Sequence, residues 1–208
     1  MRGGAHYFFL RGFRVLRVEI MIQQVTGVIL AGGKSTRVGQ NKALLPYRGR
    51  SLIESVIETM ASVFSRVVLS VHQPDSYPQL QLPEIVDRYP EIGPMGGITS
   101  VLESGESRIF CVGCDMPFLN ADLIQHLCSF DSFDAVIPVW QDRPQVLHAL
   151  YSQSLLSSFQ ESITANRYRI TDALENRQVL YLFDVDEDGR SFQNLNTPAD
   201  YDEVVKNR

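Results

Sequence analysis

Residues 25–42 read VTGVILAGGKSTRVGQNK, and this stretch decides the fold. Its first part, Val25–Leu30, is short, apolar and partly β-branched, which predicts a strand buried in a parallel sheet. Gly32 and Gly33 follow at once and allow a sharp turn in which backbone N–H groups can face an anionic ligand. The stretch therefore predicts a buried strand that runs directly into a ligand-binding loop.

The loop after this strand concentrates positive charge and hydrogen-bond donors, although the whole chain carries a formal net charge of -5 at pH 7. Multiple donors and cations at the end of a buried strand are what a bound triphosphate requires. The side chains concerned are Lys34, Ser35, Thr36, Arg37 and Lys42.

The loop does not have the spacing of a Walker-type P-loop. That motif needs a glycine five residues before the Gly-Lys-Ser sequence that begins here at Gly33. The required position holds Val28, and Gly27 is one residue too distant and does not follow the strand. A P-loop ATPase is therefore disfavoured.

Strand and helix patterns alternate along the rest of the chain. Ser51 and Glu54 form a capping box before a helix that reaches Phe64, and Asn120 caps a helix through Cys128. We also expect strands at 66–71, 85–86, 109–112, 135–139, 147–151 and 179–183, and helices at 96–103, 154–163 and 197–205. This alternation predicts one α/β domain of Rossmann-like, three-layer type, with a mostly parallel, mixed-edge sheet between two layers of helices.

Polar residues stand at the ends of several predicted strands, where such sheets bind their ligands. The strand 109–112 leads through Gly113 to Asp115, a hard carboxylate that suits Mg²⁺. An aspartate here can also cap the next turn, but the phosphate-binding loop upstream favours the metal. Ser70 ends its own strand, and Asp87 precedes a second glycine-rich loop, where it could bind a ribose or a base edge.

Three further features have a functional and a structural interpretation. Asn194 and Asn196 precede the last helix, where an amide oxygen could complete a Mg²⁺ shell or simply cap the helix. Cys111 and Cys114 have C-x-x-C spacing, but alternation along a strand puts them on opposite faces and no second pair completes a zinc site, so we expect core packing. His148 is expected to pack in or near a strand. We expect no catalytic role for it, because a phosphate nucleophile needs no general base at neutral pH.

Composition narrows the class of protein and its location. The acidic balance argues against a nucleic-acid partner. Three cysteines and no secretory signal indicate a reducing cytoplasm, and no apolar run reaches the roughly 20 residues that cross a bilayer.

The first twenty residues differ from the rest, with four arginines against one glutamate. They lack the apolar core and cleavage site of a signal peptide. We expect biological translation to begin at Met21, so that residues 1–20 are a leader outside the fold and the domain spans 21–208; an arm that binds a partner or a membrane surface is the alternative.

Five motifs, in order, resemble those of nucleotidyltransferases that build sugar nucleotides and cofactors, and most closely those of the molybdenum cofactor guanylyltransferases. The resemblance runs from Thr26 to about Val205. The motifs are Leu30–Arg37 with Lys42–Leu45, Gly93–Gly97, Cys114–Pro117, Arg143–Gln145 with His148–Leu150, and Asn194–Pro198.

The resemblance implies a GTP site and one Mg²⁺ ligand. Arg37 and Lys42 would hold the phosphates, Lys42, Arg37 and Asp115 would be the catalytic residues, and Asp115 would ligate Mg²⁺. Two positions depart from the family pattern, with Asn41 in place of a frequent acidic residue and Ser70 in place of an asparagine. The implied GTP-binding residues are Leu30, Ala31, Gly32, Gly33, Lys42, Ser70, Asp87 and Asp115.

The resemblance also implies the acceptor. Asn194, Asn196 and one of Arg167 or Arg169 would contact molybdopterin, with Asn196 helping to hold the metal. GTP and molybdopterin would give the guanine dinucleotide cofactor and diphosphate. Transient partners would be molybdenum-insertion proteins or chaperones of apo-molybdoenzymes.

Two alternatives remain open at this point. A related transferase could use CTP, but such relatives typically read Leu-Ala-Ala-Gly, whereas Gly32 here leaves room for a purine. A non-catalytic nucleotide-binding regulator of the same fold is expected to lack Asp115 or Lys42, and both are present.

Overall fold

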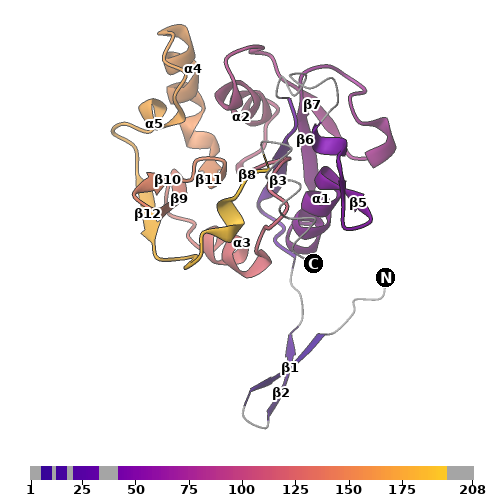
Figure 1. Cartoon of the computed structure of the whole chain (residues 1–208). Coiled ribbons are helices and arrows are strands. Elements are labelled where there is room, and N and C mark those ends of the chain that lie inside the picture. The colour runs from indigo at the N-terminus through magenta and orange to yellow at the C-terminus, as the bar shows by residue number, and fades with distance from the viewer. Residues whose placement is uncertain (1–5, 11–12, 18–20, 33–41, 196–208) are drawn as a thin grey trace.

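The computed structural model describes residues 6–10, 13–17, 21–32 and 42–195. Within these residues a mixed sheet of eight strands forms the centre of the fold (Figure 1). In chain order its strands are β3 (Thr26–Leu30), β6 (Val67–Val71), β7 (Glu84–Val86), β8 (Arg108–Gly113), β9 (Ala135–Trp140), β10 (Arg143–Pro144), β11 (His148–Ser152) and β12 (Val179–Phe183).

The strands lie in the order β10-β9-β11-β8-β3-β6-β7, and β12 pairs with β9. β8, β3, β6 and β7 are parallel neighbours, whereas β11 is antiparallel to both β8 and β9. The predicted α/β fold with a mostly parallel, mixed sheet is confirmed. After β3 the chain adds β6 on one side and later β8 on the other, which makes the end of β3 a topological switch point.

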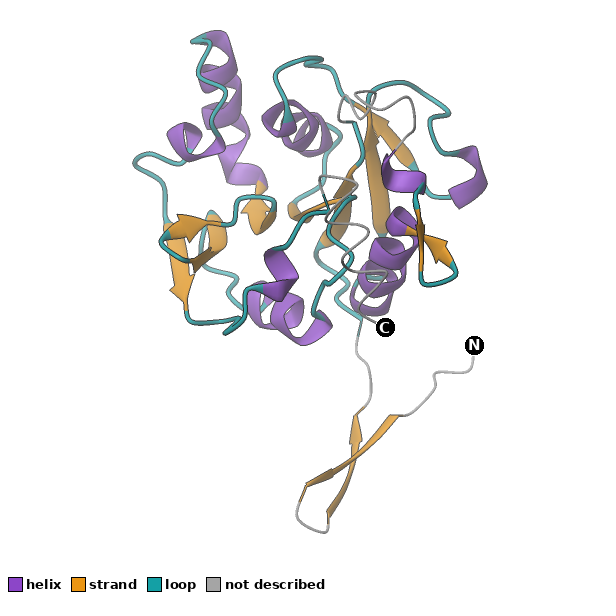
Figure 2. Cartoon of the chain, viewed as in Figure 1, coloured by secondary structure: helices purple, strands orange, loops and turns teal. Residues whose placement is uncertain are grey.

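Helices cover both faces of this sheet (Figure 2). On one face lie α1 (Leu52–Val63) and α3 (Ala121–Cys128). On the other face lie α2 (Pro94–Glu103), α4 (Leu156–Thr164) and the short α5 (Ile170–Ala173). The three layers agree with the predicted architecture.

Alternation along the central strands divides the core into two clusters. Ile29 and Phe110 pack toward α1 and α3, whereas their neighbours Val28 and Cys111 pack toward α2. All four side chains are fully buried. Continuous apolar strands of this kind are expected where helices shield both faces of a sheet.

Two predicted helix caps are confirmed. Ser51 accepts a hydrogen bond from the backbone of Glu54, whose carboxylate in turn accepts from the Ser51 backbone at 2.6 Å. The amide oxygen of Asn120 accepts from the N–H groups of Asp122 and Leu123 at 2.9 and 3.3 Å. Both caps satisfy donors that the first helical turn leaves unpaired.

Some element boundaries differ from those expected. The helix expected at 96–103 begins at Pro94, because proline at the first helical position is preset for the helix. The helix expected at 154–163 begins as a 3-10 turn over Gln153–Leu155. A small hairpin of β4 (Pro46–Tyr47) and β5 (Arg50–Ser51) was not expected.

Several elements lie outside the main sheet. β1 (His6–Leu10) and β2 (Phe13–Arg17) pair with each other in a sheet of their own. The other 3-10 turns among the described residues are η2 (Lys42–Leu44), η3 (Pro78–Leu80) and η5 (Arg190–Phe192).

The helix expected at 197–205 lies outside the described residues. The assignment of residues 1–20 as a leader stays a prediction. In the described part of the chain, no helix combines the length and apolar character that crossing a membrane needs.

Candidate functional site

Four of the segments singled out in the sequence meet at one edge of the sheet. Leu30 at the end of β3 is paired with Ser70 of β6 on one side and with Gly113 of β8 on the other. The carbonyl of Leu30 accepts from the N–H of Cys114 at 3.2 Å, and the N–H of Asp87 donates to the carbonyl of Val71 at 2.8 Å. The end of β7 is thereby held in line with the other three.

A cavity of about 330 Å³ opens at this edge. Leu30, Gly32, Ser70, Asp87 and Asp115 all line it, although they come from four different strand ends. The other lining residues are His72, Glu91, Gly93, Pro94, Gly97, Gly113, Cys114 and Leu147.

Sequence reasoning missed three of these lining residues: His72, Glu91 and Leu147. His72 directly follows β6, so the strand-end rule that selected Ser70 could have found it. Leu147 lines the cavity because β11 is antiparallel, which brings the start of that strand to the edge where its neighbours end. Glu91 lies in the loop before α2 and had no distinguishing pattern.

Two glycines are required by close contacts at this edge. A Cβ at Gly97 would lie 2.6 Å from Oγ of Ser70, and a Cβ at Gly113 would lie 2.7 Å from Oδ1 of Asp115. Real Cβ atoms essentially never come so close, so a side chain at either position would displace a residue that lines the cavity.

Asp115 lines the cavity, and the positive charge of Lys42 acts on its carboxyl, although Lys42 is not among the lining residues. Burial raises the pKa of the Asp115 carboxyl, and its own backbone N–H and the positive charge of Lys42 lower it in part. Lys42 is the first residue of η2, directly after the undescribed part of the glycine-rich loop. Lys42, which ends the predicted phosphate-binding loop, therefore lies near enough to Asp115 to act on its charge.

Asp87 lines the cavity together with Ser70 and Gly97. Burial raises the pKa of its carboxyl, while hydrogen bonds from the Tyr89 N–H and the Ser100 hydroxyl, and the nearby His72, lower it in part. Oδ1 accepts from the Tyr89 N–H at 2.8 Å, which orients the carboxylate.

Asn194 carries a buried acceptor. Its Oδ1 has no hydrogen-bond partner within the described ranges, and such an atom calls for a ligand, an ion or a water. The next residue, Leu195, is anchored by its N–H to the carbonyl of Asp115 at 2.9 Å. Asn194, next to Leu195, is thus held near the strand end that carries Asp115.

His148 packs in the core, as predicted. Its ring makes edge contacts with Phe110 and Phe192, with centroids 5.3 and 5.2 Å apart. Neither ring nitrogen has a hydrogen-bond partner among the residues described, and burial lowers the pKa of the imidazole to about 3. The neutral ring does not line the cavity.

Cys111 and Cys114 are free thiols, and burial raises the pKa of Cys114 to about 12. Across the part of the chain that the structure describes, no three His, Cys, Asp or Glu side chains gather into a metal-binding group. A metal at this site would therefore depend on few protein ligands, as Mg²⁺ commonly does beside phosphates.

Some of the predicted site residues lie outside the described part of the chain, and others are described but do not line the cavity. Gly33, Arg37 and Asn196 lie outside the described residues. Arg167 and Arg169 are described, but neither lines the cavity. Arg167 instead lies 3.9 Å from Glu175 in an ion pair at the surface.

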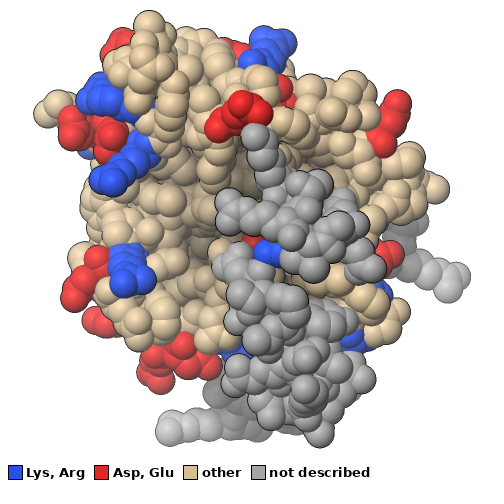
Figure 3. Space-filling view, turned by 45° about the horizontal axis from the view of Figure 1, so that its top comes forward, with Lys and Arg blue, Asp and Glu red and all other residues tan. Residues whose placement is uncertain are grey.

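Charges of both signs lie around the rim of the face drawn in Figure 3, and a basic and an acidic group are also visible beside the grey atoms near its centre. On this face the described lysines and arginines do not gather into one basic patch.

Comparison with known proteins agrees with this geometry. Residues 27–179 match the family model described as the MobA-like NTP transferase domain. A protein named probable molybdenum cofactor guanylyltransferase from Carboxydothermus hydrogenoformans is 30% identical over 193 residues, covering 89% of this chain and 97% of the relative. A protein of the same name from Natranaerobius thermophilus is 31% identical over 199 residues, covering 89% of this chain and 97% of the relative.

A solved structure shows the same likeness. The crystal structure of molybdopterin-guanine dinucleotide biosynthesis protein A from Archaeoglobus fulgidus superposes with a TM-score of 0.75 at 26% identity. The match covers 87% of this chain and 97% of that one.

Proposed function

The chain belongs to the family of MobA-like NTP transferase domains, and we propose that it transfers GMP from GTP to the molybdopterin form of the molybdenum cofactor. It is a nucleotidyltransferase of molybdenum cofactor biosynthesis, in agreement with the names of its relatives. The products of the proposed reaction are the guanine dinucleotide cofactor and diphosphate.

The observation that carries this proposal is that the charge of Lys42 acts on the carboxylate of Asp115, which lines the cavity. One side chain offers a cation for phosphate oxygens, and the other offers a carboxylate for a metal. A nucleotidyl transfer needs both around the same α-phosphate.

The nucleoside of GTP would occupy the part of the cavity between Leu30, Ser70 and Asp87. The N–H of Ala31 is already bonded to the carbonyl of Ser70 at 2.8 Å. The carbonyl of Ala31 already accepts from the Tyr77 hydroxyl at 3.3 Å, so it could offer the base only its second lone pair. Gly32, which lines the cavity, would let the ligand approach the backbone closely.

Asp115 fits a Mg²⁺ ion. Its carboxylate lines the cavity, and burial disfavours its charge, so a divalent cation would replace the hydration that it has lost. When bound, Mg²⁺ would supply positive charge to the α-phosphate. Asp115 would hold it, and Asn196, outside the described residues, is the second proposed ligand.

The bond changes balance without a general base. An oxygen of the acceptor's terminal phosphate bonds to the α-phosphorus of GTP, and the bond from that phosphorus to the β-phosphate oxygen breaks. Lys42 would neutralise the charge on the reacting and leaving phosphates. The acceptor phosphate is already ionised at neutral pH, and the buried His148 lies apart from the cavity.

Purified protein incubated with GTP, Mg²⁺ and molybdopterin tests the proposal. We expect diphosphate and the guanine dinucleotide cofactor in equal amounts, and much less product with CTP. An incubation without acceptor should release no phosphate. Product from CTP at the same rate, or hydrolysis without acceptor, would reject the assignment.

A further inference from the structure

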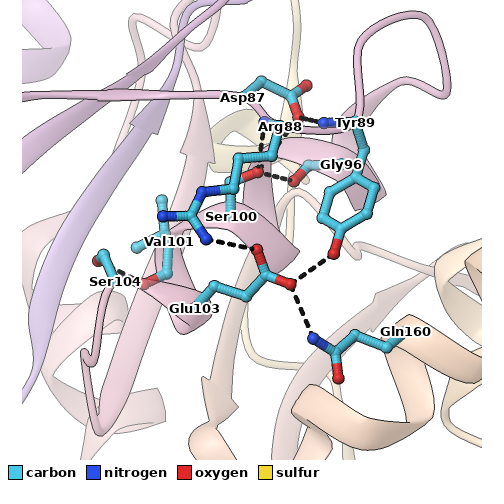
Figure 4. Close-up of polar contacts among 9 residues, drawn as sticks. All are labelled: Asp87, Arg88, Tyr89, Gly96, Ser100, Val101, Glu103, Ser104 and Gln160. Carbon is cyan, nitrogen blue, oxygen red and sulfur yellow. Dashed lines mark hydrogen bonds and ion pairs between the residues drawn. The ribbon is translucent and has the colours of Figure 1, made fainter.

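A hydrogen-bond network outside the cavity joins the loop after β7, the end of α2 and α4 (Figure 4). Its centre is the carboxylate of Glu103, the last residue of α2. That carboxylate accepts a short hydrogen bond from the Tyr89 hydroxyl, one from Nε2 of Gln160 at 2.7 Å and one from the Arg88 guanidinium at 3.3 Å. None of the four residues lines the cavity.

Glu103 is placed to act as a fixed anchor. Its side chain is 11% exposed, whereas Arg88 is 67% exposed. Burial would raise the pKa of Glu103, but the hydrogen bonds from Tyr89, Gln160 and Arg88 hold it below the ordinary value. The carboxylate is therefore ionised at neutral pH and accepts bonds from all three partners.

The same loop connects this anchor to Asp87. Tyr89 donates its backbone N–H to Oδ1 of Asp87 at 2.8 Å while its side chain holds Glu103. Arg88 donates its backbone N–H to Oγ of Ser100 at 2.8 Å. Ser100 and Glu103 are one turn apart on α2, so two consecutive turns of the helix hold residues 87–89.

Close packing leaves this loop little freedom. A Cβ at Gly96 would lie 2.6 Å from the carbonyl oxygen of Tyr89 and 2.9 Å from Oδ1 of Asp87. The loop therefore lies directly on the first turn of α2. Gly97 in the same turn lines the cavity with Asp87.

We propose that Glu103 is a positioning residue for the nucleoside end of the cavity: through Tyr89 and Arg88 it fixes the direction of the Asp87 carboxylate. The inference rests on the proposed function in that the ligand is GTP. Glu103 and Tyr89 contribute to recognition of the nucleotide, whereas Lys42 and Asp115 act on the reacting phosphates. Gln160 extends the anchor to α4, which packs on the same side of the sheet.

The test compares GTP affinity and transfer kinetics in the full chain with Glu103→Gln, Tyr89→Phe and Asp87→Asn, singly and combined. Glu103→Gln and Tyr89→Phe should each weaken GTP binding and raise KM about fivefold to tenfold, with kcat within about twofold. In a protein that already carries Asp87→Asn, either second change should weaken GTP binding and raise KM by less than about twofold. The carboxylate that Glu103 and Tyr89 position is then already gone.

Glu106→Gln is the matched control. Glu106 accepts hydrogen bonds from Arg66 and Thr26 and does not line the cavity, so its loss should leave GTP binding unchanged. Thermal melting checks that each variant is folded. Tyr89→Phe keeps the aromatic ring and serves if Glu103→Gln does not fold.

Unchanged GTP binding in both variants, or equal losses with and without Asp87, would overturn the positioning role and leave the proposed function standing. Absence of GTP binding by the unmodified chain would overturn both. Loss of binding in Glu106→Gln of the same size would show that the effect is general destabilisation and would also overturn the positioning role.

Discussion

The positive charge of Lys42 lowers the pKa of the Asp115 carboxyl, which burial raises. The two residues come from different segments, one from the end of the glycine-rich loop and the other from the turn after β8. The pairing of Leu30 with Gly113 places the start of the glycine-rich loop beside the turn that carries Asp115. The charge of Lys42 thus acts on an acid that lines the cavity.

Removal of either charge should stop transfer without unfolding the chain. For Asp115→Asn and Lys42→Met we expect kcat to fall by at least about 10²-fold, or roughly 3 kcal/mol of transition-state stabilisation. Asp131→Asn, at an exposed position away from the cavity, is the control and should keep full activity. Diphosphate release under saturating GTP is the measurement, and near-normal turnover in either variant would contradict the assigned roles.

Gly32→Ala should change the choice of nucleotide. A Cβ at Gly32 meets its nearest neighbour, the backbone nitrogen of His72, at 3.4 Å, so the methyl group fits without displacing the backbone. It would take up space at the edge of the cavity, and we expect kcat/KM for GTP relative to CTP to fall by about tenfold. An unchanged ratio, measured in a competition assay with both triphosphates, would show that Gly32 does not select the base.

Gly97→Ala should damage both stability and GTP binding, because its Cβ would lie 2.6 Å from Oγ of Ser70. Overpacking of this kind typically costs about 1–3 kcal/mol in the free energy of unfolding. Removing the hydroxyl in the double variant Ser70→Ala/Gly97→Ala should restore part of the stability. Denaturant melts of Ser70→Ala, Gly97→Ala and the double variant give the coupling free energy between the two positions, and strictly additive losses would argue against this contact.

The stability of the fold should depend on His148 below neutral pH. Burial lowers its folded pKa from 6.5 to about 3, so between these values the unfolded chain binds more protons than the folded one. The contribution of the neutral His148 to the free energy of unfolding should therefore be fully present above pH 6.5. It should decrease as pH falls toward 3, by up to about 1.4 kcal/mol per pH unit.

Urea melts from pH 7 to pH 4 measure this dependence. His148→Leu should show a shallower decline than the unmodified chain, whereas His126→Gln, at an exposed position of α3, should keep the original slope. Equal slopes in all three proteins would show that His148 is protonated without unfolding.

Sequence patterns predicted the parts of this molecule that local chemistry determines. Apolar runs predicted the strands, and Ser51 and Asn120 predicted the starts of two helices. The rule that ligands bind at the ends of strands predicted that Leu30 and Asp115 lie at the same edge of the sheet. Each of these signals lies within a few neighbouring residues.

The remaining features depend on contacts that no local pattern encodes. The apolar run before Ser152 predicts a strand but not its direction, and the antiparallel direction of β11 is what brings Leu147 to the cavity. Glu103 resembles any acidic residue at a helix end until the fold brings it to Tyr89 and Gln160.

A crystal structure of the chain with GTP and Mg²⁺ tests the central claim most directly. We expect the α-phosphate between Nζ of Lys42 and a magnesium ion on the Asp115 carboxylate, with the nucleoside against Ser70 and Asp87. A triphosphate bound elsewhere, out of reach of either side chain, would contradict the account.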